Sequence, residues 1–196
     1  ILLLLPHITA CIGAPGASRG TLKHDGIERS YRLYAPASVA AAEAVPLVMV
    51  LHGGSGTGRL IARYTHFDQV AEEQGFIAVY PDGLDRHWND GRVAEAGADD
   101  VGFLTALVDA LAGEYPVDLG RVYVAGASNG GMMALRLACE ATDRFAAVAC
   151  VIGAIPEQQA DQWEPDGPMP VLIMNGEADP IVPWEGGDVT VQREVH

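Results

Sequence analysis

Unbroken apolar runs that alternate with amphipathic segments constrain this chain more than any other feature of its sequence. A strand that is apolar on both sides must be covered on both faces, as in a parallel sheet. The segments between the runs have the apolar spacing of helices. The pattern predicts an α/β fold, with a mostly parallel sheet and helices on both faces. We expect strands at 28–36, 46–51, 76–80, 122–125, 146–152 and 171–175, helices at 60–74, 99–111 and 129–139, and a long loop at 82–98.

The net charge and the cysteine spacing exclude some classes of protein for this sequence. The 196 residues include 12 Lys and Arg against 26 Asp and Glu, which gives a net charge of −14 at pH 7. Such an acidic surface repels phosphate backbones, so we expect no nucleic-acid partner. The three cysteines, Cys11, Cys139 and Cys150, lack the spacing of a structural zinc site, and we expect no metal.

The most informative motif is Gly126-Ala127-Ser128-Asn129-Gly130, which lies between an expected strand and an expected helix. This is G-x-S-x-G in the strand, turn and helix context that a nucleophilic serine requires. Side chains at the two flanking glycines would collide with the neighbouring strand and helix. The turn lifts the hydroxyl above the carboxyl edge of the sheet, so we predict that Ser128 is a nucleophile. A simple Gly/Ser-rich turn is the alternative.

A nucleophilic serine needs hydrogen-bond donors for the oxyanion that forms on attack. One expected donor is the backbone N–H of Asn129, the residue after the nucleophile. The other comes from His52-Gly53-Gly54, which follows the strand 46–51, and we choose Gly54. We expect His52 to belong to this oxyanion loop rather than to act as a base. An ordinary turn at the end of a strand is the alternative.

We expect an acid in the loop that follows the strand 171–175. Asp179 lies in this loop, where it would fix the tautomer of a histidine and stabilise its cation. Glu177 is the alternative acid, and a solvated loop carboxylate is the alternative role. Trp88 and Trp184 lie in loops at the same edge and are expected to bind substrate at the cleft rim. Simple packing is the alternative for both tryptophans.

Further runs surround these motifs in a fixed order: Arg29-Ser30-Tyr31-Arg32-Leu33-Tyr34, Leu51-His52-Gly53-Gly54, Tyr80-Pro81-Asp82-Gly83, Trp88-Asn89-Asp90-Gly91, Asp99-Asp100-Val101-Gly102-Phe103, Gly126-Ala127-Ser128-Asn129-Gly130-Gly131-Met132 and Asp179-Pro180-Ile181-Val182-Pro183-Trp184. The joint order resembles the α/β-hydrolase superfamily, and within it the polyhydroxybutyrate depolymerase-type esterases, which include feruloyl esterases and mycobacterial-type lipoprotein esterases. The resemblance implies secreted serine esterases that cleave polyester, acetyl or feruloyl bonds without a cofactor. The partner it implies is a small or polymeric ester substrate.

The resemblance also implies a catalytic histidine beyond a further strand after the acid. The histidine of this chain that follows Asp179 is His196, and no clear strand separates the two. We therefore expect the chain to be cut before its true base, with His196 as the alternative base. Without a base Ser128 is a poor nucleophile, so we expect almost no hydrolysis. Apolar surface on the strand 171–175 is expected to be exposed as an edge.

The first residues indicate export. The apolar start leads to Ile8-Thr9-Ala10-Cys11, which fits the end of a secretory leader and resembles a bacterial lipobox in which Cys11 would be lipidated. We expect residues 1–20 to be a leader remnant and flexible tether, and residues 21–196 to be an incomplete α/β-hydrolase domain. The expected location is secreted, periplasmic or at the cell envelope, with a membrane tether through Cys11. A stray apolar terminus is the alternative.

Two other functions remain open at this point. A peptidase or a dienelactone-type hydrolase has the same fold, although dienelactone hydrolases usually carry Cys where this chain has Ser128. A non-catalytic binding protein could retain the fold after losing its base. Fold does not choose among polyester, acetyl and feruloyl substrates.

Overall fold

A computed structural model of the chain describes residues 15–92, 98–160, 163, 165–187 and 189. Seven strands form one sheet in the order β1-β2-β4-β3-β5-β6-β7. The strands are β1 (Gly16–His24), β2 (Ile27–Ala35), β3 (Val45–Leu51), β4 (Ile77–Pro81), β5 (Val117–Ala127), β6 (Ala147–Val151) and β7 (Val171–Met174). The helices are α1 (Gly58–Thr65), α2 (Phe67–Gln74), α3 (Asp100–Glu114), α4 (Asn129–Glu140) and α5 (Glu157–Ala160), with short 3₁₀ turns at η1 (Ala37–Ala41) and η2 (Leu84–Arg86).

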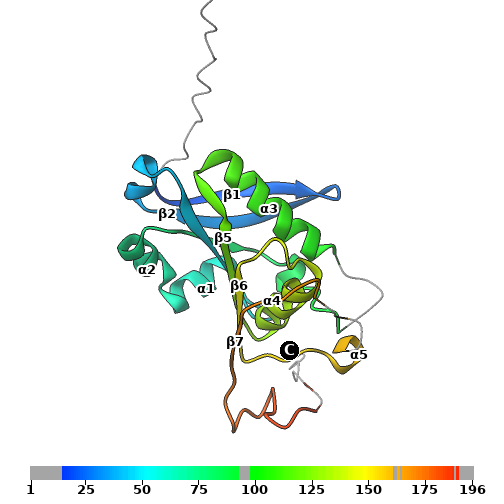
Figure 1. Cartoon of the computed structure of the whole chain (residues 1–196). Coiled ribbons are helices and arrows are strands. Elements are labelled where there is room, and N and C mark those ends of the chain that lie inside the picture. The colour runs from blue at the N-terminus through cyan, green and yellow to red at the C-terminus, as the bar shows by residue number, and fades with distance from the viewer. Residues whose placement is uncertain (1–14, 93–97, 161–162, 164, 188, 190–196) are drawn as a thin grey trace, which may run out of the picture.

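The sheet is mostly parallel, as the apolar runs predict. Strands β4, β3, β5, β6 and β7 run parallel to one another, whereas β1 and β2 form an antiparallel hairpin and β2 also pairs antiparallel with β4. Helices α1 and α2 cover one face of the sheet, and α3 and α4 cover the other (Figure 1). Each face has its own core of buried side chains, and the larger core lies under α3 and α4. This confirms the expected α/β architecture.

The tether that we expected up to residue 20 is wrong for residues 16–20. They form the first half of β1, which pairs with β2 from Gly16 opposite Ala35 to His24 opposite Ile27. Most side chains of this strand are exposed, so the sequence lacks the apolar alternation that indicates a strand. Gly20 has a particular role, because a Cβ atom there would lie 2.4 Å from the ring of Tyr31.

The single helix expected over 60–74 is two helices. His66 adopts a left-handed conformation (φ 55°), ends α1 and begins α2. Asp68, in the first turn of α2, accepts hydrogen bonds from both terminal nitrogens of Arg32 on β2 (2.8 and 2.5 Å) and from the Tyr80 hydroxyl on β4 (2.7 Å). These bonds link the start of α2 to β2 and β4 of the sheet.

Strand β7 exposes apolar side chains, as expected. Val171, Leu172, Ile173 and Met174 are 44–56% exposed, although β7 is hydrogen-bonded to β6 along its whole length. Apolar strands of a parallel sheet are normally covered on both faces. The exposure of this strand therefore leaves apolar surface at one end of the sheet.

We compared the helices of the described residues with the requirements for crossing a membrane. Within these residues no helix combines the length and the apolar character needed to cross a bilayer. The longest, α3, has 15 residues and begins at Asp100, whose side chain is buried.

Candidate active site

Ser128 lies at the turn between β5 and α4 in a strained backbone conformation. Its φ of 53° and ψ of −121° lie in a region that residues with a Cβ atom rarely adopt. Two backbone hydrogen bonds fix the turn: Ser128 N–H donates to Val151 O on β6 (2.8 Å), and Met132 N–H donates to Ser128 O (2.9 Å). The parallel sheet places this turn at the carboxyl ends of its strands, where the loops after β3, β4 and β7 also begin.

The two glycines of the motif are required by close backbone contacts. A Cβ atom at Gly126 would lie 2.0 Å from Gly130 O, and one at Gly130 would lie 2.6 Å from Leu51 O and 2.5 Å from His52 O. All three distances are far below van der Waals contact. The expected collision with the neighbouring strand and helix is confirmed, and it shows why the turn can be this tight.

Two backbone N–H groups near Ser128 have no acceptor in the described structure. Gly53 lies against the nucleophile turn, since a Cβ atom there would lie 3.5 Å from Ser128 Cβ. Among the residues that the structure describes, neither Gly54 N–H nor Asn129 N–H has an acceptor. These are the two donors chosen from the sequence, so the oxyanion loop and the N-terminus of α4 converge beside Ser128.

His52 supports the oxyanion loop through both of its ring nitrogens. Its Nδ1 lies 2.8 Å from Gly53 O, and its Nε2 accepts a hydrogen bond from Gly83 N–H at 3.0 Å. An acceptor at Nε2 requires the neutral ring with its proton on Nδ1. Burial lowers the pKa of His52, which favours the same neutral form. Both ring nitrogens are therefore occupied within the fold, and His52 links the loop after β3 to Gly83.

We predict that His52 makes the fold less stable in acid. Because its folded pKa lies below the unfolded value of about 6.5, the unfolded state binds more protons as the pH falls through that value. The free energy of unfolding in urea should therefore decrease from pH 8 to pH 5. The decrease should be smaller for His52→Gln, whereas an identical pH slope in both proteins would show that His52 does not contribute.

Trp88 is not at the cleft rim, which corrects our expectation. Its side chain is 1% exposed, and its indole N–H donates to His52 O at 2.9 Å. The indole ring lies over the His52 ring with 5.0 Å between centroids. In this buried position the large apolar ring is packed and its N–H has an acceptor. Trp88 therefore packs beneath the oxyanion loop. Packing, the alternative reading, is correct for this residue.

The side chain of Asn129 clamps the loop that contains Trp88. Its Oδ1 accepts from Trp88 N–H (2.8 Å), and its Nδ2 donates to Trp88 O (3.0 Å) and to the Asp90 carboxylate (2.6 Å). Asp90 is buried and also forms an ion pair with Arg92 (2.6 Å). Sequence reasoning assigned Asn129 only a backbone role and missed Asp90, although both lie in runs that carry the family resemblance.

We predict that Asn129→Ala loosens the site while keeping the backbone N–H. Leaving the Asp90 carboxylate with one partner fewer should lower the free energy of unfolding by about 1–3 kcal/mol. In the protein expressed from its gene, the shift of the expected oxyanion donor should lower kcat/KM for p-nitrophenyl acetate between about 10- and 100-fold. Gln159→Ala is the control, because Gln159 binds Gly91 O of the same loop from its half-exposed position. Equal losses in both variants would contradict the clamp.

His87 is a second residue near the site that sequence reasoning did not assign. A Cβ atom at Gly54 would lie 3.2 Å from the His87 ring, so the exposed imidazole lies directly beside the expected oxyanion donor. Two consecutive strained residues, Asp85 (φ 48°) and Arg86 (φ 61°), precede it. Arg86 O accepts from Ser55 N–H (2.8 Å), which holds the turn against the oxyanion loop.

Asp179 follows β7, two strands from β5 in the sheet. One carboxylate oxygen, Oδ1, accepts from Val182 N–H (2.9 Å) and Ile181 N–H (2.8 Å), and these bonds lower the pKa of Asp179. The other oxygen has no partner among the described residues. The amide of Asn175 pairs with both backbone groups of Gly153 and ties the start of this loop to the end of β6.

Of the remaining predicted site residues, two are exposed and two lie outside the described part of the chain. Glu177 and Trp184 are exposed, and Trp184 is 58% exposed in the loop after Asp179. Cys11 and His196 lie outside the described residues. Among the described histidines, none shares a hydrogen bond with Ser128.

One cluster has ligand types that suit a metal ion. His24 Nε2 and the carboxylates of Asp25 and Asp99 lie within 4.8 Å of one another. Asp99 is also the N-cap of α3, where it accepts from Gly102 N–H at 2.9 Å, and it pairs with His24 at 2.9 Å. These bonds account for the cluster as a link between β1 and α3.

The sheet order, the two covering layers and the strained serine turn define an α/β-hydrolase fold. Comparison with known proteins then identifies the family. The family model described as Esterase PHB depolymerase matches residues 29–182, and the chain belongs to this family.

Individual relatives agree with this assignment. A protein of Nocardia uniformis subsp. tsuyamanensis that bears the name of an esterase, NocK, is 41% identical over 166 residues, which are 82% of this chain and 48% of that protein. The bifunctional acetylxylan esterase/xylanase XynS20E of Neocallimastix patriciarum is 28% identical over 83% of this chain and 23% of its own length. A crystal structure of a thermostable esterase superposes with a TM-score of 0.66 at 23% identity, over 87% of this chain and 49% of that chain. The chain thus spans about half the length of NocK and of the thermostable esterase.

Proposed function

We propose that this protein is a serine carboxyl-ester hydrolase that forms an acyl-enzyme on Ser128. The strained backbone of Ser128, with two unbonded N–H groups beside it, is the observation that carries the proposal. Family membership supports ester hydrolysis as the reaction. A strained serine costs about 1–3 kcal/mol of stability, which a purely structural turn has no reason to retain.

The proposed reaction has two displacements. Ser128 Oγ attacks the ester carbonyl while a base takes its proton, and the N–H groups of Gly54 and Asn129 bind the oxyanion. The alcohol then leaves with a proton from the base, and water releases the acid from the acyl-enzyme by the same steps in reverse order. The unbonded Oδ2 of Asp179 is suited to accept the N–H of the base histidine. The order Ser, Asp, His assigns that histidine to a position after Asp179, which lies outside the described residues.

The proposed substrates are acetyl, feruloyl or hydroxyalkanoate esters. The acetylxylan esterase among the relatives supports the first, and the family description supports the third. The exposed Trp184 ring, in the loop of the proposed acid, would contact an aryl or acyl group at the cleft rim. We also propose export through the apolar leader, with Cys11 as a lipid attachment site.

A panel of esters tests the function. The protein expressed from its gene is incubated with p-nitrophenyl acetate, methyl ferulate, a hydroxybutyrate trimer and a peptide p-nitroanilide, with Ser128→Ala as the control. The proposal predicts hydrolysis of at least one ester well above the control. Hydrolysis of peptide substrates alone would indicate a peptidase, and no turnover of any substrate would indicate a binding protein; either result would overturn the proposal.

A further inference from the structure

The arginines of this chain are distributed in an unusual way. Six of them form ion pairs with carboxylates: Arg29, Arg32, Arg92, Arg121, Arg136 and Arg144. Within the described part of the chain, four have no carboxylate partner, and three of these four line the same cavity. These three are Arg19, Arg59 and Arg86. In a chain with more than twice as many acids as bases, unpaired cations gathered in one place require an explanation.

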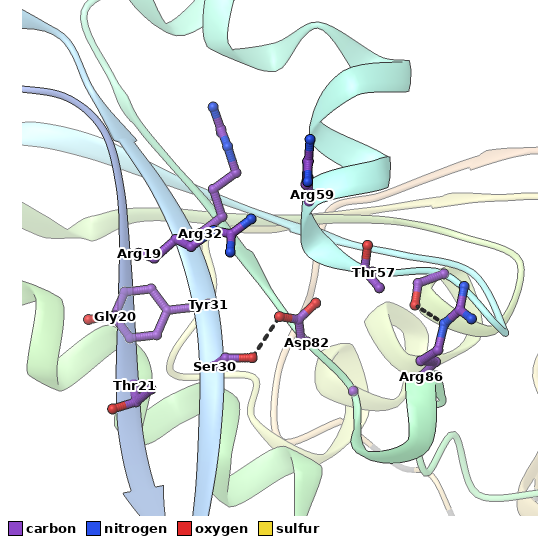
Figure 2. A pocket seen from close by; sticks show the side chains of 12 residues that line it. Arg19, Gly20, Thr21, Ser30, Tyr31, Arg32, Thr57, Arg59, Asp82 and Arg86 are labelled. Carbon is purple, nitrogen blue, oxygen red and sulfur yellow. Dashed lines mark hydrogen bonds between the residues drawn. The ribbon is translucent and has the colours of Figure 1, made fainter.

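The cavity has a volume of about 590 Å³, and its lining includes residues that follow the carboxyl ends of β3 and β4. Arg19 and Arg32 project from the β1–β2 hairpin on one side, Arg59 from the first turn of α1, and Arg86 from the turn after β4 on the other side (Figure 2). The arginines thus come from three separate segments that the fold brings together. No local run of basic residues in the sequence indicates this cluster.

The carboxylate that lines this cavity is already bound by other groups. Asp82 lies among them, but its Oδ1 accepts from Gly58 N–H and its Oδ2 from the Ser30 hydroxyl, both at 2.7 Å. Arg32 is neutralised by Asp68 from outside the cavity lining. Three unpaired guanidinium groups against Asp82 leave an excess of two positive charges.

We propose that this cavity binds an oxyanion, a carboxylate or phosphate group carried by a small ligand. Guanidinium groups present paired N–H donors that match the oxygens of both anions. Arg86 uses its Nε for Gly56 O at 3.3 Å, and in the described structure its terminal nitrogens have no partner. Thr21 and Thr57 also line the cavity. The Thr57 hydroxyl accepts from Leu60 N–H at 3.2 Å and keeps its own proton to donate to a ligand.

The cavity and the proposed active site share one loop but differ in their lining. Gly53 lies against the Ser128 turn, whereas Gly56 and Thr57 of the same loop line the cavity. Ser128, Asn129 and Asp179 do not line it. Anion binding in the arginine cavity can therefore be tested separately from ester hydrolysis at Ser128.

Calorimetric titration at constant ionic strength tests the proposal. The probes are inorganic pyrophosphate and D-glucuronate, which represent a phosphate ligand and an acidic sugar. The test variant is Arg19→Gln combined with Arg59→Gln, because both side chains are exposed and their loss leaves the core intact. Arg63→Gln is the matched control, since Arg63 is also exposed and unpaired in the described structure and lies on the same helix but outside the cavity lining.

We expect saturable binding of at least one probe. The Kd should rise about tenfold or more in the double variant, as the loss of one charge-assisted pair implies, and change less than about twofold in Arg63→Gln. The tighter probe identifies the source of the anion. Absence of saturable binding of both probes would overturn the proposal. Binding that both variants weaken equally, or that neither weakens, would overturn it as well.

Discussion

Replacing Ser128 with alanine in the protein expressed from its gene is expected to lower kcat/KM for ester hydrolysis by about 10⁴-fold or more, because no other group can form the acyl-enzyme. The remaining rate would come from the N–H groups of Gly54 and Asn129, which the substitution does not remove. Alanine has the same Cβ atom as serine, so the strained backbone at φ 53° is kept and the free energy of unfolding should change little. Steady-state kinetics and urea unfolding on the same preparation check both parts.

A matched serine substitution shows whether the loss is specific. Ser38 is exposed in η1, away from the carboxyl edge of the sheet, and Ser38→Ala should retain wild-type rates. If Ser128→Ala kept a rate within tenfold of the wild type, the proposed acyl-enzyme would be wrong.

The second large effect is expected at Arg29, which is 3% exposed and links three elements. Its guanidinium donates to the Asp100 carboxylate at the start of α3 (2.7 Å) and to Asp82 O after β4 (3.2 Å), and it lies 4.1 Å from the centre of the Phe103 ring. Arg29→Met should lower the free energy of unfolding by about 3–5 kcal/mol, because it leaves the Asp100 carboxylate buried without its cation. Urea unfolding measures the loss.

The control for Arg29 is the same change in an exposed ion pair. Arg121 pairs with Asp118 at 2.6 Å, with side chains 46% and 35% exposed. Exposed pairs contribute about 0–1 kcal/mol, so Arg121→Met should have a small effect. Equal effects of the two substitutions would show that the buried position of Arg29 does not matter.

Those parts of the fold that depend on local pattern could be predicted from the sequence. The apolar runs located β3 to β7 because a buried parallel strand requires apolar residues on both sides. The G-x-S-x-G motif located the turn at Ser128, since the contacts that exclude a side chain at Gly126 and Gly130 arise within that strand, turn and helix and from the adjacent β3 loop.

The structural features that the sequence did not predict depend on contacts between residues that are far apart in the chain. Strand β1 forms because β2 offers its free edge, and the helix break at His66 follows from bonds of Asp68 to Arg32 and Tyr80. A tryptophan in a polar loop is typical of a cleft rim, yet Trp88 is buried because His52 O accepts its N–H. The cavity of Arg19, Arg59 and Arg86 likewise exists only once the sheet is assembled.

Mass spectrometry after labelling with a fluorophosphonate tests the central claim most directly, because this reagent forms a stable covalent bond with an activated serine. The protein expressed from its gene is labelled, digested and sequenced by fragmentation. Our account predicts a single adduct on the Oγ of Ser128 and none in Ser128→Ala. An adduct on another residue, or an unlabelled Ser128 in a protein that hydrolyses esters, would contradict it.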